Sequence, residues 1–141
     1  MLRPRILVVD DDEDVRDVIV LSLEMAGFAV ACASDCEHAR AVIEGQRIDA
    51  ALVDIRLPGE SGLELARALR ATRIPVLLVT GDQTLEPTDG LPILFKPFRL
   101  AELGERVHAI VKERAGTRSH SGLNQTFGTQ ARSSATPYND L

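Results

Sequence analysis

Five acidic residues in a row follow a short apolar segment near the start of the chain, in the stretch RILVVDDDED. Adjacent carboxylates repel one another, so such a cluster either faces solvent or holds a cation. Acidic side chains are also favoured at helix N-termini, and Asp12, Glu13 and Asp14 fit that simpler role. Asp10 and Asp11 come directly after the apolar segment. They are therefore candidates for binding chemistry, with helix capping as their alternative.

Three further apolar segments are followed at once by a side chain that can take part in chemistry, namely Asp54, Thr80 and Lys96. Ligands of open parallel α/β sheets bind beyond the carboxyl ends of the strands. We therefore expect these three side chains to meet Asp10 and Asp11 at one edge of a sheet. Three carboxylates in one cleft need a cation, and hard oxygen ligands suit Mg²⁺ or Mn²⁺.

A carboxylate in such a site can also act as a nucleophile and form an acyl phosphate. The metal and Lys96 would neutralise the charge that this adds. Thr80 could donate a hydrogen bond to a phosphoryl oxygen, and the following Gly81 leaves space for a phosphoryl group to approach the backbone. The residue types therefore predict phosphoryl chemistry on a carboxylate.

Short apolar segments alternate with amphipathic ones along the chain, and they supply the elements that such a site needs. Four of the five predicted strands are almost continuously hydrophobic, as parallel strands covered on both faces are. The predicted strands are Ile6–Val9, Ala29–Ala33, Ala50–Val53, Val76–Val79 and Ile93–Phe95. Apolar residues at three- and four-residue steps predict helices around residues 15–26, 39–43, 61–69 and 100–111. This alternation predicts an α/β fold with a parallel sheet.

Two segments break this pattern. Residues 81–92 contain two prolines and two glycines with little apolar spacing, so we expect a short helix or none there. From Gly116 onward the composition shifts to small and polar residues, too poor in hydrophobic residues to form a core. We therefore predict one domain over residues 1–115 and a polar, flexible tail over residues 116–141.

Composition narrows the possible classes of function. The chain has 141 residues and a net charge of −5, which argues against direct nucleic-acid binding through a basic surface. It has no apolar run long enough for a membrane span and no signal-peptide pattern at its start, so we expect a cytoplasmic protein. Cys32, Cys36 and His38 could form a small metal or redox site; the alternative is that both cysteines are small hydrophobic residues in a reducing compartment.

Four motifs occur in order at the predicted strand ends: VVDDD at 8–12, LVDIRLPGESGLE at 52–64, VTG at 79–81 and FKPF at 95–98. Through these motifs, residues 5–114 resemble the receiver domain of two-component response regulators. The resemblance is to stand-alone, single-domain receivers with a shortened fourth helix. It implies a doubly wound, five-stranded sheet of the flavodoxin-like type with strand order 2-1-3-4-5.

The resemblance implies that Asp54 accepts a phosphoryl group from the phosphohistidine of a histidine kinase or a histidine phosphotransfer protein. It also implies that Mg²⁺, or Mn²⁺ in its place, is bound by Asp10, Asp11 and Asp54 together with the backbone carbonyl of Arg56.

The resemblance implies further roles at the fourth and fifth strands. Lys96 would pair first with the Asp54 carboxylate and then with the phosphoryl group, and Thr80 would move toward that group. The Lys96–Pro97 peptide bond would be cis. One departure from the family is Ile93, because receivers typically carry Tyr or Phe three residues before the lysine.

Together these residues predict a single-domain response regulator in a Mg²⁺-dependent phosphorelay. Its output would be contact with a downstream protein, or onward transfer of the phosphoryl group as a shuttle or sink. It would catalyse its own phosphorylation and dephosphorylation without being a conventional enzyme. One alternative is a pseudo-receiver that binds partners without switching. Another is an aspartyl-phosphate phosphatase, although these usually need a second Asp where this chain has Arg56.

Overall fold

The computed structural model describes residues 3–81, 88 and 90–119, the last five of these through their backbone only. In this part of the chain, five strands form one parallel sheet with the order β2-β1-β3-β4-β5. The strands are β1 (Arg5–Val9), β2 (Ala29–Ala33), β3 (Ala50–Asp54), β4 (Val76–Thr80) and β5 (Ile93–Phe95). The predicted parallel sheet and its strand order are confirmed.

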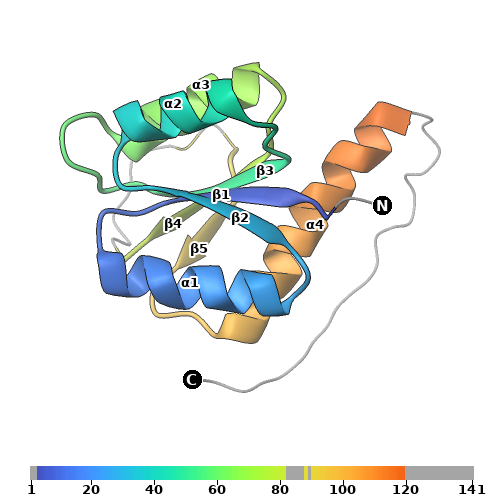
Figure 1. Cartoon of the computed structure of the whole chain (residues 1–141), viewed down its shortest axis with the longest axis horizontal. Coiled ribbons are helices and arrows are strands. Elements are labelled where there is room, and N and C mark those ends of the chain that lie inside the picture. The colour runs from blue at the N-terminus through green and yellow to red at the C-terminus, as the bar shows by residue number, and fades with distance from the viewer. Residues whose placement is uncertain (1–2, 82–87, 89, 120–141) are drawn as a thin grey trace.

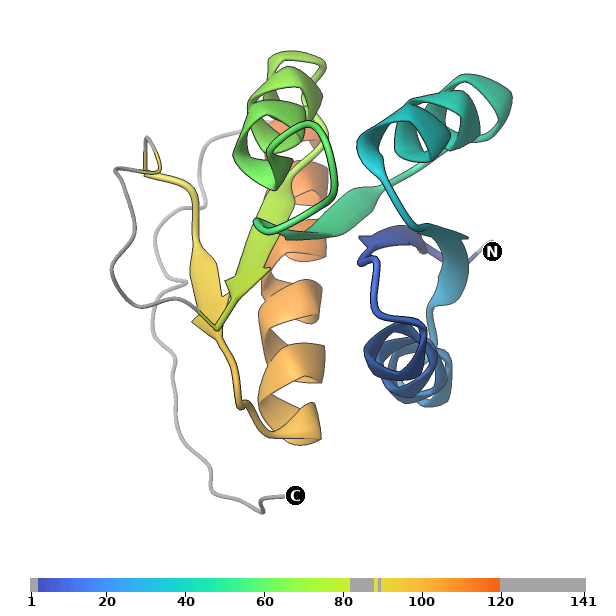
Figure 2. The ribbon, with the colours of Figure 1, turned by 90° about the vertical axis from the view of Figure 1, so that its left-hand side faces the viewer.

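Helices cover both faces of the sheet. The described residues form α1 (Glu13–Met25), α2 (Cys36–Gly45), α3 (Gly62–Ala71) and α4 (Leu100–Ser119). Figure 1 shows α2 and α3 on one face and α1 and α4 on the other, and the turned view in Figure 2 shows the sheet between these two layers. The fold is therefore doubly wound, as predicted. None of these helices combines the length and apolar character needed to cross a membrane.

The two faces of the sheet contribute to two separate hydrophobic cores. Leu7 and Val9 of β1 pack on the side of α2 and α3, whereas Ile6 and Val8 pack on the side of α1 and α4. Successive side chains of a strand point to opposite faces, so a central strand needs apolar residues at every position. This explains why all residues of β3 and β4 are buried.

Capping side chains place the starts of α1 and α3, the helices that follow β1 and β3. Asp12 is the N-cap of α1, and its side chain accepts hydrogen bonds from the N–H groups of Asp14 and Val15. Ser61 is the N-cap of α3, and its hydroxyl accepts a hydrogen bond from the N–H of Leu63. Such caps satisfy backbone donors that have no partner within the helix.

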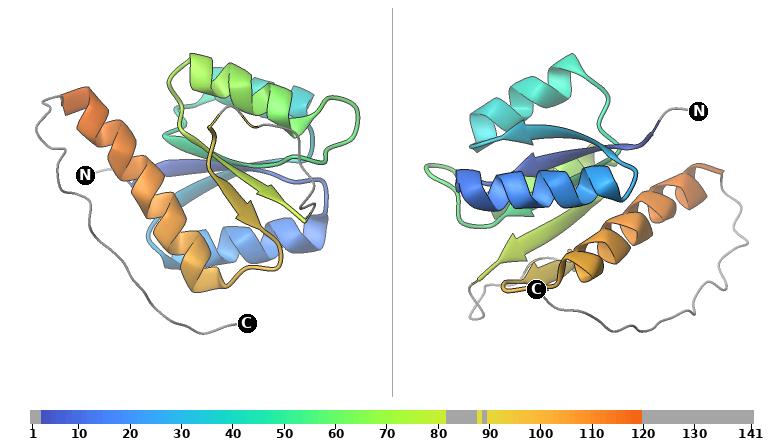
Figure 3. Two further views of the ribbon diagram at one scale, coloured as in Figure 1. Left: turned by 180° about the vertical axis from the view of Figure 1, so that it is seen from behind. Right: turned by 60° about the horizontal axis from the view of Figure 1, so that its bottom comes forward.

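The segment between β4 and β5 lies only partly within the described residues. Gly81, Thr88 and residues 90–92 are not helical. A short helix or none was predicted for residues 81–92, and residues 82–87 and 89 of that segment lie outside the described residues. The tail predicted over residues 116–141 differs at its start, because α4 continues to Ser119; the rest of it lies outside the described residues. The two views in Figure 3 show β5 beside β4, with α4 crossing the sheet and ending at Ser119.

The turn after α1 depends on a glycine with a positive φ. Gly27 has φ of +100°, a region that side chains with a Cβ disfavour. We expect Gly27→Ala to lower the free energy of unfolding by about 1 kcal/mol. Gly45→Ala is the matched control, because Gly45 ends α2 with open space around it and no positive φ. Urea denaturation followed by circular dichroism measures both; equal stability of the two variants would contradict this account of the turn.

Candidate functional site

The neighbouring strands β1 and β3 carry the buried carboxylates to the same edge of the sheet. Val9 of β1 pairs with Val53 of β3, so Asp10 and Asp54 come next in the same register. One carboxylate oxygen from each of Asp10, Asp11 and Asp54 lies within 4.8 Å of the others. Asp10 is 2 % exposed and Asp54 8 %, whereas Asp11 is open to solvent. The predicted meeting of these three carboxylates is therefore found in the structure.

Lys96 brings a positive charge to this group from the far edge of the sheet. Its Nζ lies 3.1 Å from Asp54 Oδ2 and 3.5 Å from Asp10 Oδ2. Its backbone N–H donates to the Thr80 carbonyl at 2.8 Å, and the Lys96–Pro97 peptide bond is cis, as expected. One ammonium group thus pairs with the two buried carboxylates.

Burial and the neighbouring charges act in different directions on this group. Burial raises the pKa of Asp10 above its usual 3.8, although the Asp12 N–H and the charge of Lys96 oppose that effect. Burial alone would lower the pKa of Lys96, but its hydrogen bond to Asp54 and the charges of Asp54 and Asp10 outweigh burial and raise it. Lys96 is therefore protonated, while ionised Asp10 is unfavourable in the folded protein.

Both oxygens of the Asp54 carboxylate are held by hydrogen bonds. Oδ1 accepts from the backbone N–H of Arg56 at 2.9 Å, and Oδ2 accepts from Lys96 Nζ. Because one contact comes from the loop after β3 and the other from the residue after β5, the orientation of the carboxylate depends on both segments. The backbone of Arg56 is therefore adjacent to the site, as predicted, while its side chain is exposed.

Thr80 ends β4, next to the strand that carries Asp54. Asp54 pairs with Val79 in the ladder, so Thr80 lies one position further toward the carboxyl edge. Thr80 is fully buried, and its carbonyl accepts a hydrogen bond from the backbone N–H of Lys96. The structure thus brings the predicted Thr80 to the same edge as the carboxylates and the lysine.

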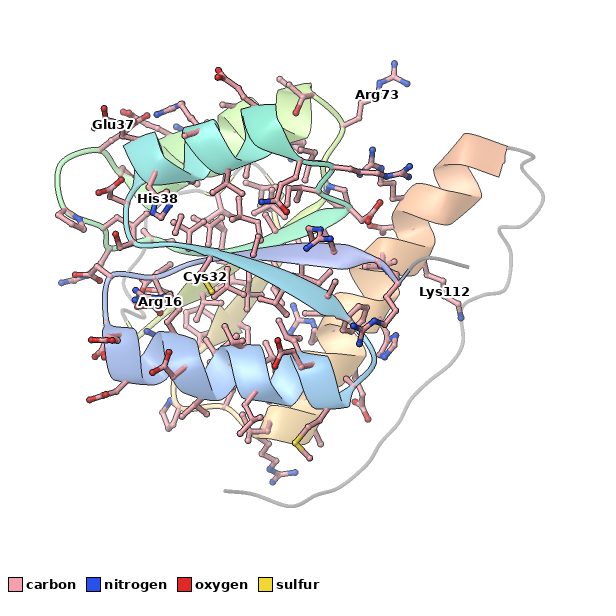
Figure 4. The ribbon with its side chains drawn as sticks, viewed as in Figure 1. Arg16, Cys32, Glu37, His38, Arg73 and Lys112 are labelled. Atoms are coloured by element: carbon pink, nitrogen blue, oxygen red, sulfur yellow. The ribbon has the colours of Figure 1, made fainter. Side chains whose placement is uncertain are left out.

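Arg16 is a contact of the site that the sequence did not reveal. Its Nη1 donates to the backbone carbonyl of Asp10 at 2.7 Å. Figure 4 shows Arg16 extending from α1 near the end of β1. The only signal in the sequence was its position two residues after the acidic run, which is typical of an exposed residue and gave no reason to select it.

The two cysteines do not form a common site. The thiol of Cys32 is affected by charges on α1, whereas that of Cys36 is affected by charges of the α2 and α3 layer, and burial raises the pKa of both. Both are free thiols, and His38 is exposed on α2 (Figure 4). Within the described residues, the group of three possible metal ligands is the aspartate cluster.

The donor set of that cluster fits a hard divalent cation. Carboxylate oxygens are the ligands that Mg²⁺ prefers, and Mg²⁺ commonly uses one or two of them while keeping several waters. The exposure of Asp11 leaves the site open to water. Lys96 offsets one of the three negative charges, so a divalent cation would relieve the remaining repulsion.

Comparison with known proteins agrees with this geometry. Residues 6–108 match the family described as the response regulator receiver domain. The transcriptional regulatory protein PrrA of Mycobacterium tuberculosis is 37 % identical over 133 residues, which are 89 % of this chain and 57 % of PrrA. The chain spans about half the length of the curated relatives it matches.

Solved structures show the same fold. A CheY-like receiver domain protein from Methanospirillum hungatei superposes with a TM-score of 0.76 and 30 % identity, covering 83 % of this chain and 99 % of that one. The response regulator TrrA of Thermotoga maritima, solved in complex with Mg²⁺ and BeF, has a TM-score of 0.70 and 28 % identity, covering 76 % and 98 %. The chain belongs to the response regulator receiver domain family.

Proposed function

We propose that Asp54 accepts a phosphoryl group from the phosphohistidine of a histidine kinase or histidine phosphotransfer protein, in a Mg²⁺-dependent reaction. The observation that carries this proposal is the Asp54 carboxylate itself. It is almost buried, lies beside two further carboxylates, and has Lys96 Nζ at 3.1 Å. The complex of TrrA with Mg²⁺ and BeF supports the same use of an acidic pocket in this fold.

The reaction transfers the phosphoryl group from a histidine nitrogen of the donor to a carboxylate oxygen of Asp54. A carboxylate oxygen of Asp54 attacks the phosphorus, the P–N bond to the imidazole breaks, and the imidazole leaves to take up a proton from solvent. The product is an acyl phosphate on Asp54. Lys96 is already paired with Asp54 Oδ2, and it could pair instead with the negatively charged phosphoryl oxygens once they are attached to Asp54. The hydroxyl of the buried Thr80 is the candidate donor to a phosphoryl oxygen.

The metal would be held by Asp10, Asp11 and Asp54 together with the backbone carbonyl of Arg56. When bound, Mg²⁺ supplies positive charge to the phosphoryl oxygens. The aspartyl-phosphate phosphatase alternative is disfavoured, because the position two residues after Asp54 holds Arg56, which cannot serve as a general acid or base.

We propose further that the chain acts as a single-domain regulator, whose output is contact with a downstream protein or onward transfer of the phosphoryl group as a shuttle or sink. The longer relative PrrA is named for transcriptional regulation, so a transcriptional output is the competing possibility. The lifetime of the acyl phosphate separates the first two outputs, since an adaptor needs a persistent label and a sink loses it rapidly.

Acetyl phosphate with Mg²⁺ should add one phosphoryl group to the protein, as measured by intact mass. Asp54→Asn should abolish the addition, because an amide is no nucleophile for phosphorus. Glu64→Gln is the control, because it replaces a carboxylate by an amide at an exposed position of α3 that is not part of the aspartate cluster. A parent protein that remains unlabelled would favour the pseudo-receiver alternative.

Replacing Asp10 with Asn should stabilise the metal-free protein while weakening Mg²⁺ binding. The pKa of Asp10 is raised, so its contribution to stability is full below 3.8 and is lost as the pH rises through the folded pKa. At neutral pH the ionised carboxylate therefore costs stability, and we expect Asp10→Asn to gain about 1 kcal/mol. Thermal unfolding with and without Mg²⁺ measures both effects. If Mg²⁺ raised the unfolding temperature of Asp10→Asn as much as that of the parent, Asp10 would not be a metal ligand.

One exposed face of α1 is apolar. Val18, Leu21 and Met25 are 51 %, 59 % and 80 % exposed, and their spacing of three and four residues places them on one side of the helix. α1 begins two residues after Asp11, and this face runs along the helix from Val18 to its last residue, Met25. A protein donor must bring its histidine to Asp54, and an amphipathic helix of that donor would pack on such a face.

The apolar face of α1 should therefore matter for a protein donor more than for a small one. We expect Leu21→Lys to lower the ratio of phosphotransfer from a cognate phosphohistidine protein to phosphorylation by acetyl phosphate by about tenfold. Ala41→Lys, on the exposed side of α2, is the matched control for an added lysine. An equal ratio for Leu21→Lys and the parent would place the docking surface elsewhere.

A further inference from the structure

The first residue of α3 lies directly against the backbone of Asp54. A Cβ atom at Gly62 would overlap the carbonyl oxygen of Asp54, and it would lie 2.9 Å from the Asp54 carbonyl carbon and 2.9 Å from Ile55 Cα. These neighbours are backbone atoms, which cannot rotate away as a side chain can. Unlike Gly27, Gly62 has no positive φ. The position therefore requires glycine because of space rather than backbone conformation.

Backbone hydrogen bonds hold the start of α3 and the end of β3 together at this contact. The N–H of Gly62 donates to the carbonyl of Ile55 at 3.0 Å, and the N–H of Ile55 donates to the Val79 carbonyl of β4 at 3.0 Å. The loop of residues 55–61 thus leaves the sheet at Asp54 and returns to the same point at Gly62. These main-chain hydrogen bonds close its base.

Glu60, near the end of this loop, is attached to α2. Arg40 forms a bidentate pair with Glu60, with Nη1–Oε1 at 2.6 Å and Nη2–Oε2 at 2.7 Å. The buried Cys36 thiol contacts the Glu60 carbonyl at 3.6 Å. The loop is therefore held at its base and again at Glu60, two residues before Gly62, so a displacement at position 62 would pass to Asp54 and Ile55.

We propose that Gly62 is a positioning residue for the metal and phosphoryl site. The absence of a side chain lets the start of α3 close on the Asp54–Ile55 peptide. That closure sets the Asp54 carboxylate against Asp10 and keeps the Arg56 N–H on Asp54 Oδ1. The inference rests on the proposed function, because it concerns the same metal-binding carboxylates.

The test is a Mg²⁺ titration of the full chain, followed by backbone amide NMR and compared with urea stability. We expect Gly62→Ala to weaken Mg²⁺ binding roughly tenfold or more, as the loss of a group that orients metal ligands does. Leu69→Ala is the matched control for lost stability, because Leu69 is a buried residue of the same helix. Gly104→Ala is the control for the added methyl group, since open space surrounds Gly104. Both controls should bind Mg²⁺ within about twofold of the parent.

The outcomes separate the two proposals. A parent protein that does not bind Mg²⁺ would overturn the proposed function, and the positional role of Gly62 with it. A parent that binds, together with a folded Gly62→Ala protein of equal affinity, would overturn the role of Gly62 alone. Should Gly62→Ala fail to fold, the substitution is repeated in a Gly45→Ala, Gly104→Ala background, where alanine favours the helices. If that protein also fails to fold, Gly62 serves folding only, and the positional role is wrong.

Discussion

Repulsion among three carboxylates at one edge of a buried sheet is the constraint on which the rest of the molecule depends. In a parallel sheet, neighbouring strands end on the same side, so Asp10 and Asp54 meet wherever β1 and β3 pair. The apolar core below them provides little charge screening. Lys96 crosses from β5 to offset part of the charge. The negative charge that remains would attract a cation.

The fold makes this crowding tolerable because it holds the charged groups on rigid elements. The strands that carry them are covered by helices on both sides and pack into two cores. Main-chain hydrogen bonds then fix the segments just beyond the strands. The N–H groups of Lys96, Ile55 and Gly62 donate to the carbonyls of Thr80, Val79 and Ile55, respectively. Function and stability conflict most at Asp10, which is almost buried and has a raised pKa. If these carboxylates did not repel one another in the metal-free protein, a bound cation would release less free energy.

The acidic run after β1 divides into two roles with different physical causes. Asp10 and Asp11 belong to the carboxylate cluster, whereas Asp12 caps α1 through its side chain, with Glu13 and Asp14 in the first turn of the helix. The helix dipole favours negative charge at that end, so the second half of the run needs no ligand. The same helix carries its exposed apolar residues further along, from Val18 to Met25. The carboxylate cluster, the helix start and the candidate docking face therefore follow one another within residues 10–25.

The sequence by itself determined the parallel α/β architecture and the types of residue at the site. Hydrophobic runs and helical spacing are local patterns, and a parallel sheet places the residues that follow its strands at one edge. Only the tertiary structure decided which atoms touch. It showed that the Asp35 side chain caps α2 by accepting from the N–H of His38, and that the two cysteine thiols lie near the charges of different layers. The contacts of Arg16 with Asp10, of Arg40 with Glu60, and of Gly62 with Asp54 join segments that pack together only after the chain has folded. Their spacing along the chain follows no period, so no local pattern in the sequence could reveal them.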